Sequence, residues 1–139
     1  MVVKKRLPYL ILPIITLILE ILPYGAVCNF MRPSIDGTHI GHFRELYSYF
    51  DLMPFGYANF SPLITAIITC IILAMLLIYL VTGKSHILTG VRFALCFGVI
   101  ISLCPLLYGI NFYSVVGALI TVSLIAELLV VHFKIKKWN

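Results

Sequence analysis

The sequence predicts an all-α integral membrane protein, in which four transmembrane helices form a bundle of two tandem hairpins with an amphipathic helix in the long first outer loop. The mean hydropathy is +1.10, and 62% of the 139 residues are hydrophobic whereas only 11% are charged. A helix needs roughly 20 largely apolar residues to cross a bilayer. Four stretches fulfil this requirement and leave no room for a soluble domain: 7–27, 62–82, 90–108 and 114–133. We therefore expect one transmembrane domain over residues 1–139.

The basic residues predict how this domain is oriented. If the chain crosses four times, eight of the ten Lys and Arg residues fall on one side of the membrane; they are Lys4, Lys5, Arg6, Lys84, Arg92, Lys134, Lys136 and Lys137. Basic residues gather on the cytoplasmic side of membrane proteins. We therefore expect both termini in the cytoplasm of a cell, with a bacterial inner membrane as the expected setting. The net charge of +5 is then a topology signal, and no nucleic-acid partner is expected.

The first apolar stretch, 7–27, follows a basic N-terminus and in this respect resembles a secretory signal. Its apolar run is long for a signal peptide. Val27 also stands where a lipoprotein cleavage site has a small residue before the cysteine, here Cys28. We therefore expect an uncleaved first helix.

The first outer loop, 28–61, is much longer than the second outer connection, and long loops in compact proteins are often functional. At about 100° per residue, its apolar residues gather on one arc: Ile40, Phe43, Leu46, Tyr47, Phe50 and Met53. Arg44, Glu45, Ser48 and Asp51 fall opposite. The pattern predicts an amphipathic helix over 39–52. One role for this helix is a lid that packs over the end of the bundle or rests on the lipid headgroups. The other is a binding surface, on which Arg44, Glu45, Ser48 and Asp51 would orient a partner.

The same loop places Asp36, His39, His42 and Glu45 at intervals of three. Imidazole and carboxylate groups bind metal ions, but on a helix each step of three rotates the position by about 60°. Only neighbouring pairs would share an ion, so we expect no metal site and no cofactor. A pH-responsive pair of His39 and His42 stays open as an alternative.

A shift of 52 positions aligns 59–82 with 111–134 without a gap, and matches Asn59-Phe60 to Asn111-Phe112. The preceding helices end alike, in Pro23-Tyr24-Gly25 and in Pro105, two leucines and Tyr108-Gly109. We interpret the chain as a parallel pseudo-repeat of two helical hairpins. Glycine would end the first helix of each hairpin, and the asparagine would cap the start of the second.

Two acidic residues lie inside the predicted spans, Glu20 and Glu127. A buried charge is costly in a membrane, so such residues are candidates for function. With about 1.5 Å per residue and a core of about 30 Å, their levels would differ by about 11 Å. They are then too far apart to share a proton in one chain. A proton or cation role and a purely structural, hydrogen-bonded role both stay open.

The sequence contains little that predicts a catalytic site or a disulfide framework. The sequence has no Ser-His-Asp set, HExxH or CxxC motif, and "TGKS" at 82–85 lacks the glycine that a phosphate loop requires at position 78. Three of the four cysteines fall inside spans, which predicts no disulfide framework, although a bridge between Cys28 and Cys104 stays open.

Taken together, these patterns predict a small, non-enzymatic polytopic membrane protein. It would act through its outer loop as a binding or accessory subunit of the immunity or transporter-associated type. Its partner would be another membrane protein or a second copy of the chain. The alternative is a minimal oligomeric transporter or channel subunit that uses Glu20 or Glu127.

Overall fold

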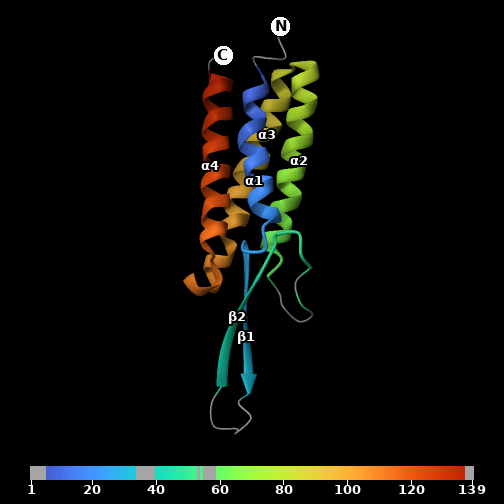
Figure 1. The fold of residues 1–139 in the computed structure, drawn as a ribbon. Helices are drawn as coiled ribbons and strands as arrows, with labels where there is room; N and C mark the ends of the chain where they lie inside the picture. The colour runs from blue at the N-terminus through green and yellow to red at the C-terminus, as the bar shows by residue number, and fades with distance from the viewer. Residues whose placement is uncertain (1–5, 34–39, 53, 55–58, 137–139) are drawn as a thin grey trace.

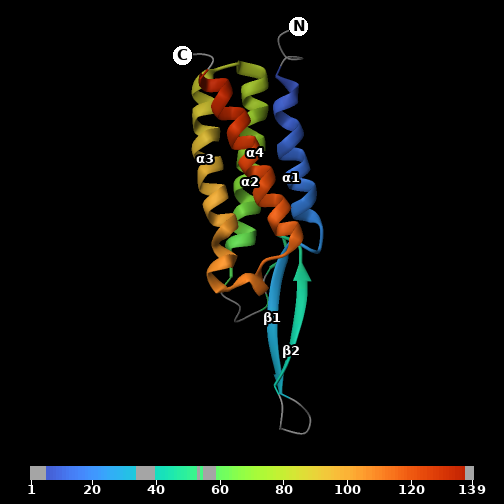
Figure 2. The same cartoon turned by 90° about the vertical axis from the view of Figure 1, so that its left-hand side faces the viewer.

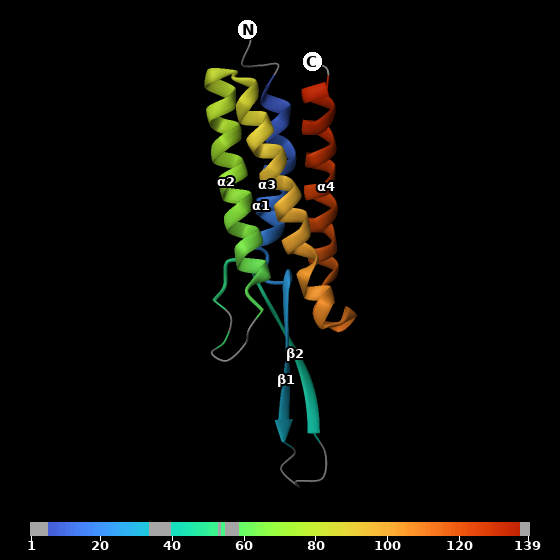
Figure 3. The ribbon, with the colours of Figure 1, turned by 180° about the vertical axis from the view of Figure 1, so that it is seen from behind.

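The computed structural model describes residues 6–33, 40–52, 54 and 59–136. It contains four α-helices: α1 Ile11–Ile21, α2 Ser61–Thr82, α3 Ser85–Leu103 and α4 Val115–Lys136. These helices lie side by side, and the end of α4 lies at the same end of the molecule as the connection between α2 and α3 (Figure 1). α1 and α3 each contact both α2 and α4, so that α3 lies between α2 and α4 when seen from behind (Figure 3).

Three helical segments are long and apolar enough to cross a membrane: Ser61–Thr82, Ser85–Tyr108 and Val115–Lys136. Their outward faces carry large apolar side chains that are at least half exposed, such as Ile71, Phe97 and Val122. Hydroxyl and carboxyl groups lie inside. A water-soluble bundle has the opposite arrangement, whereas lipid readily solvates an apolar surface. The predicted helical, membrane-type character is confirmed in these three segments.

The first helix is shorter than predicted. A 3₁₀ turn, η2 Leu7–Leu10, leads into α1, which ends at Ile21 rather than at residue 27. Leu22 is already extended, with a ψ of 136°, because the ring of Pro23 disfavours the helical conformation in the residue before it. The apolar helix Leu7–Ile21 falls below the length of the other three segments.

The amphipathic helix predicted over 39–52 is wrong, because this part of the loop is a β-strand. β1 Ala26–Pro33 and β2 Ile40–Tyr47 pair antiparallel, with Ala26 opposite Tyr47 and Pro33 opposite Ile40. A short isolated helix is marginal in water, whereas the ladder gives the backbone groups on one edge of each strand a partner. The resulting hairpin projects beyond the end of the bundle (Figure 2).

A single side chain connects the end of β2 to the bundle. Tyr49 is only 2% exposed, and its backbone N–H donates to the carbonyl of Glu20 at 2.9 Å. Its ring occupies space left by two glycines: a Cβ atom at Gly25 would lie 2.8 Å from the ring, and one at Gly117 would lie 3.2 Å from the hydroxyl. The loop therefore covers the bundle end, but through Tyr49 rather than through a helix.

The predicted asparagine caps are also wrong. The N-cap residue of α2 is Phe60, without a side-chain bond, because the amide oxygen of Asn59 accepts from the Ser61 hydroxyl instead. At α4 the hydroxyl of Ser114 accepts from the N–H of Gly117 at 2.8 Å, as an N-cap does. The predicted turn role of Gly109 agrees with its φ of 117°, which non-glycine residues rarely adopt. The repeat itself stays a prediction.

The strand register predicts which engineered cysteines will pair. Phe30 lies opposite Phe43 with the rings stacked 5.2 Å apart. We expect the double variant Phe30→Cys with Phe43→Cys to form a disulfide on mild oxidation, because directly opposite Cβ atoms lie within about 5.5 Å. The control is Phe30→Cys with Arg44→Cys, since a shift of one residue moves the side chain to the other face of the sheet. Equal cross-linking of both pairs, measured by thiol blocking, would contradict the hairpin.

Candidate functional site

The interior of the bundle contains two carboxyl groups, and each lies within hydrogen-bond distance of a threonine hydroxyl on a neighbouring helix. Glu20 lies in the last turn of α1 and is 0% exposed, and its Oε1 lies 2.7 Å from Thr69 Oγ1 on α2. Glu127 lies on α4 and is 3% exposed, and its Oε1 lies 2.8 Å from Thr16 Oγ1 on α1. Thr16 also contacts the hydroxyl of Ser123 at 2.6 Å. We call these five residues the interior polar cluster.

The two carboxyl groups lie at closer levels than the sequence predicts. Thr16 contacts Glu127 and precedes Glu20 by four residues on α1, which is a rise of about 6 Å. The expectation of about 11 Å assumed a helix that continues to residue 27, whereas α1 ends one residue after Glu20. Each carboxyl group is nevertheless hydrogen-bonded to hydroxyl groups in the described structure, and the two do not form a direct carboxyl pair.

The contacts around Thr16 require more protons than the hydroxyl groups supply. Thr16 Oγ1 lies within hydrogen-bond distance of Leu12 O (3.1 Å), Ser123 Oγ (2.6 Å) and Glu127 Oε1 (2.8 Å). With one proton on each of the two hydroxyl groups, all three contacts are separate two-centre hydrogen bonds only when a third proton is supplied. If Glu127 is a neutral acid, it donates the third: Thr16 then accepts from Glu127 and Ser123 and donates to Leu12.

The hydrogen-bond contacts around Glu20 also favour a neutral acid. Thr69 Oγ1 lies 2.7 Å from Glu20 Oε1 and 3.2 Å from the carbonyl oxygen of Thr65. The hydroxyl group has one proton to donate, so a neutral Glu20 supplies the other. Neutral carboxyl groups also avoid the large cost of a buried charge. Both contact patterns therefore favour protonated acids.

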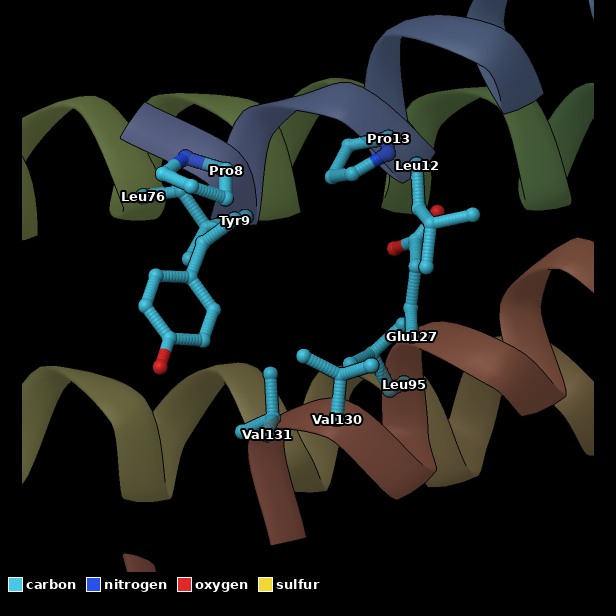
Figure 4. A pocket seen from close by; sticks show the side chains of 9 residues that line it. All are labelled: Pro8, Tyr9, Leu12, Pro13, Leu76, Leu95, Glu127, Val130 and Val131. Atoms are coloured by element: carbon cyan, nitrogen blue, oxygen red, sulfur yellow. The ribbon is translucent and has the colours of Figure 1, made fainter. Parts of the chain in front are cut away.

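One oxygen of each acid has no hydrogen-bond partner among the described residues; these atoms are Glu20 Oε2 and Glu127 Oε2. Glu127 also lines a cavity of about 20 Å³. That space is sufficient for one water molecule. The cavity extends from Tyr9 at one end to Glu127 beside Pro13 at the other, between residues of η2 and all four helices (Figure 4).

Three hydroxyl residues of the interior polar cluster, Thr16, Thr69 and Ser123, were missed by the sequence analysis. The sequence does contain a spacing that points to Thr16 and Ser123. Thr16 precedes Glu20 by four residues, and Ser123 precedes Glu127 by four. This spacing places both members on one helix face.

The candidate residues of the outer loop do not form one site. His39 lies outside the described residues, and His42 lies in β2 opposite Met31. Arg44 and Glu45 are neighbours on β2 and therefore point to opposite faces of the hairpin, and Asp51 accepts from the N–H of Ser48 in the following turn. The single polar face predicted from Arg44, Glu45, Ser48 and Asp51 is therefore wrong.

The polar groups of β2 instead have separate local partners. Arg44 donates to the carbonyl of Tyr113 at 3.4 Å, and the Tyr47 hydroxyl donates to Glu45 at 2.5 Å. This second bond raises the pKa of Tyr47 to about 12. In the described part of the chain, no group of three or more His, Cys, Asp and Glu residues is arranged to hold a metal ion.

None of the four cysteines forms a disulfide, so the bridge between Cys28 and Cys104 is absent. Cys28 is buried in β1. Burial, together with the negative charge of Glu45, raises the pKa of the Cys28 thiol to about 11.

The proton count around Thr16 predicts that its hydroxyl stabilises the fold. We expect Thr16→Val to lower the free energy of unfolding by about 1–3 kcal/mol, because it leaves buried polar atoms of Ser123 and Glu127 without a partner. The matched control is Thr82→Val, which removes an exposed hydroxyl bonded to the carbonyl of Ile78. Unfolding in detergent measures both variants, and an equal loss would contradict the buried role.

The Cys28 pKa predicts its reactivity. The neutral thiol is favoured below the raised pKa of about 11, and maleimides react with the thiolate. In a variant with the other three cysteines changed to serine, we expect labelling of Cys28 to stay slow at neutral pH. The rate should rise only in strongly alkaline buffer. Fast labelling at neutral pH, equal to that of an added Leu52→Cys, would contradict the buried position.

Both carboxyl groups in the interior of the bundle are hydrogen-bonded only to neutral groups among the described residues. Comparison with family models, with curated proteins and with solved structures found no match. The function of the chain must therefore follow from its own contacts.

Proposed function

We propose that this chain is a non-enzymatic membrane protein, an accessory or immunity-type binding subunit, in which a four-span helical bundle anchors a β-hairpin that binds a protein partner outside the bilayer. One observation carries the proposal: the hairpin projects beyond the bundle (Figure 2), and some of its apolar side chains are exposed. Met31 is 72% exposed and Phe43 is 41% exposed. Exposed apolar groups at a position away from lipid favour a protein interface.

The construction of the hairpin supports a partner as well. A two-stranded hairpin alone is at best marginally stable in water. In the described structure its sheet contains only β1 and β2, with one isolated bridge between Ala26 and Tyr113. The outer edge of β2 therefore presents backbone groups to which an extended segment of a partner can add as a further strand. Such addition would cover Phe43 on one face of the hairpin.

The proposed orientation follows from charge. Five of the seven described basic residues lie before α1, in the α2–α3 connection, in the first half of α3 or late in α4, whereas Arg32 and Arg44 lie in the hairpin. Because such residues favour the cytoplasmic side, the termini face the cytoplasm and the hairpin faces outward. The helix Leu7–Ile21 then spans a locally thin bilayer. In this proposal the bundle holds the hairpin at a fixed position relative to the membrane surface.

A second candidate is a transporter or channel subunit that oligomerises around Glu20 or Glu127. The observation that favours it is the cavity beside Glu127. A transport pathway needs access from both sides, whereas Tyr49 covers the bundle end next to Glu20. Proton flux into vesicles that contain the purified chain would favour this second candidate over the binding role.

Photo-crosslinking tests the binding role directly. We expect a photoreactive phenylalanine analogue at position 43 to capture a defined protein in native membranes. The same analogue at Phe97, which is 54% exposed on α3, should capture mainly lipid. The paired substitution Phe43→Glu should abolish co-purification of the captured protein, since a charge replaces buried apolar area of the interface. Capture that is equal at both positions, or absent at position 43, would count against the proposal.

A further inference from the structure

We propose that Glu127 is a proton-binding site whose proton exchanges with water through the cavity beside it, from the end of the bundle that carries the α2–α3 connection. This inference does not depend on the role of the hairpin. It rests on three observations: the proton count around Thr16, the unpartnered oxygen of a 97% buried carboxyl group, and a continuous set of lining residues that leads to the surface.

The first step is the occupied state of the site. Three oxygen atoms surround Thr16 Oγ1, and the contacts are satisfied together when Glu127 donates the proton that the hydroxyl groups lack. When the proton leaves to a water molecule, the Thr16 hydroxyl turns from Leu12 O to Glu127 Oε1. The acid therefore keeps its hydrogen bond to Thr16 in both states, as the donor when it is protonated and as the acceptor when it is ionised. A site that is hydrogen-bonded with and without its proton can bind and release it.

The second step is access. An open groove at the surface, with an empty volume of about 590 Å³, is lined by Tyr9, Val130, Phe133 and Lys134. Tyr9 and Val130 also line the cavity that ends at Glu127. These two side chains therefore stand between the cavity and the groove, and Tyr9 lies at the end of the cavity opposite Glu127 (Figure 4). In the proposed route, water from the groove passes these side chains to reach Glu127, one oxygen of which has no partner among the described residues.

The third step is the charge environment. The cavity lining contains no Lys, Arg or His residue in the described structure. The nearest titratable groups on the packed elements are Tyr9 on η2, Glu20 on α1 and Tyr79 on α2, whereas α3 contributes Leu95 to the lining. Arg6 stacks on Tyr79, and Lys134 of α4 lies 5.9 Å from the centre of the Tyr9 ring. These cations lie at the mouth rather than beside the carboxyl group, so a proton is the ligand that neutralises Glu127.

Infrared spectroscopy of the full chain in lipid vesicles tests the site, because a neutral carboxyl group has a C=O band separate from that of a carboxylate. The chain has only five acidic residues, of which Glu45 and Asp51 are exposed. We expect Glu127→Gln to remove one neutral-acid band at neutral pH. In D₂O the Glu127 band should shift as its proton exchanges, and strongly alkaline buffer should convert it to the carboxylate band.

The access route is tested by Val130→Phe, which enlarges a lining side chain that is 43% exposed and therefore tolerates substitution. We expect it to slow the exchange of the Glu127 band roughly tenfold, equivalent to a barrier increase of about 1.4 kcal/mol. Leu129→Phe is the matched control, because Leu129 is similarly exposed and does not line the cavity. Val131→Leu, which narrows the cavity from its buried side, should act in the same direction as Val130→Phe.

Either of two outcomes would overturn the proposal. If Glu127→Gln removes no neutral-acid band, Glu127 is ionised and does not hold a proton. If Val130→Phe, Val131→Leu and Leu129→Phe all exchange as fast as the wild type, the proton does not pass through the cavity. Glu20 is not among the lining residues, so its infrared band provides an internal reference. If Val130→Phe changes the fold, the bands of both acids will change. The Glu127→Gln result would then still decide whether the site is protonated.

Discussion

Hydrogen bonding between polar side chains inside the bundle is the interaction on which the rest of this structure depends. In lipid, apolar side chains do not drive helices together, because the acyl chains solvate them as well as other side chains do. Contacts between polar groups then help to determine which helices are neighbours. Thr16 with Glu127 connects α1 to α4, and Glu20 with Thr69 connects α1 to α2. The shortest helix thus contributes to both carboxyl contacts.

Glu20 is also the point where the bundle and the hairpin meet. Its side chain contacts α2, and its backbone carbonyl accepts from Tyr49 just after β2. The hydroxyl of Ser114 donates to the carbonyl of Gly25 at 2.5 Å, which fixes the start of β1 to the start of α4. These two attachments hold both strands at the bundle end. The hairpin is therefore attached to the bundle at the bases of both strands.

The sequence predicts much of the helical part and little of the hairpin. α2 and α4 begin and end close to the predicted limits, because a long apolar run in lipid has few alternatives to a helix. The hairpin depends on pairing between 26–33 and 40–47, which no local pattern contains. The spacing of Ile40, Phe43, Leu46 and Phe50 fits a helical arc better than the two-residue alternation of a strand, so periodicity alone favoured the wrong element.

The candidate site was likewise only half predictable. Glu20 and Glu127 are evident from composition, because acids are rare in apolar spans. Their separation was overestimated, since the early end of α1 depends on Pro23 and on the strand that follows. The hydroxyl partners come from other helices, and a sequence does not state which helices are neighbours. Thr69 is an example, because it meets Glu20 only through the contact of α1 with α2.

The two acids differ in what separates them from water, and this difference limits what the bundle can do. Glu127 adjoins a cavity that leads toward Tyr9 and the surface groove. Glu20 lies beneath Tyr49, whose ring is held between Gly25 and Gly117. A proton on Glu127 therefore exchanges with one end of the bundle only, as long as Tyr49 stays in place. Displacement of Tyr49 requires movement of the chain directly after β2. A molecule that moves the hairpin would therefore uncover Glu20 rather than Glu127. In this fold the chain that follows β2 and the interior acid Glu20 are linked through Tyr49.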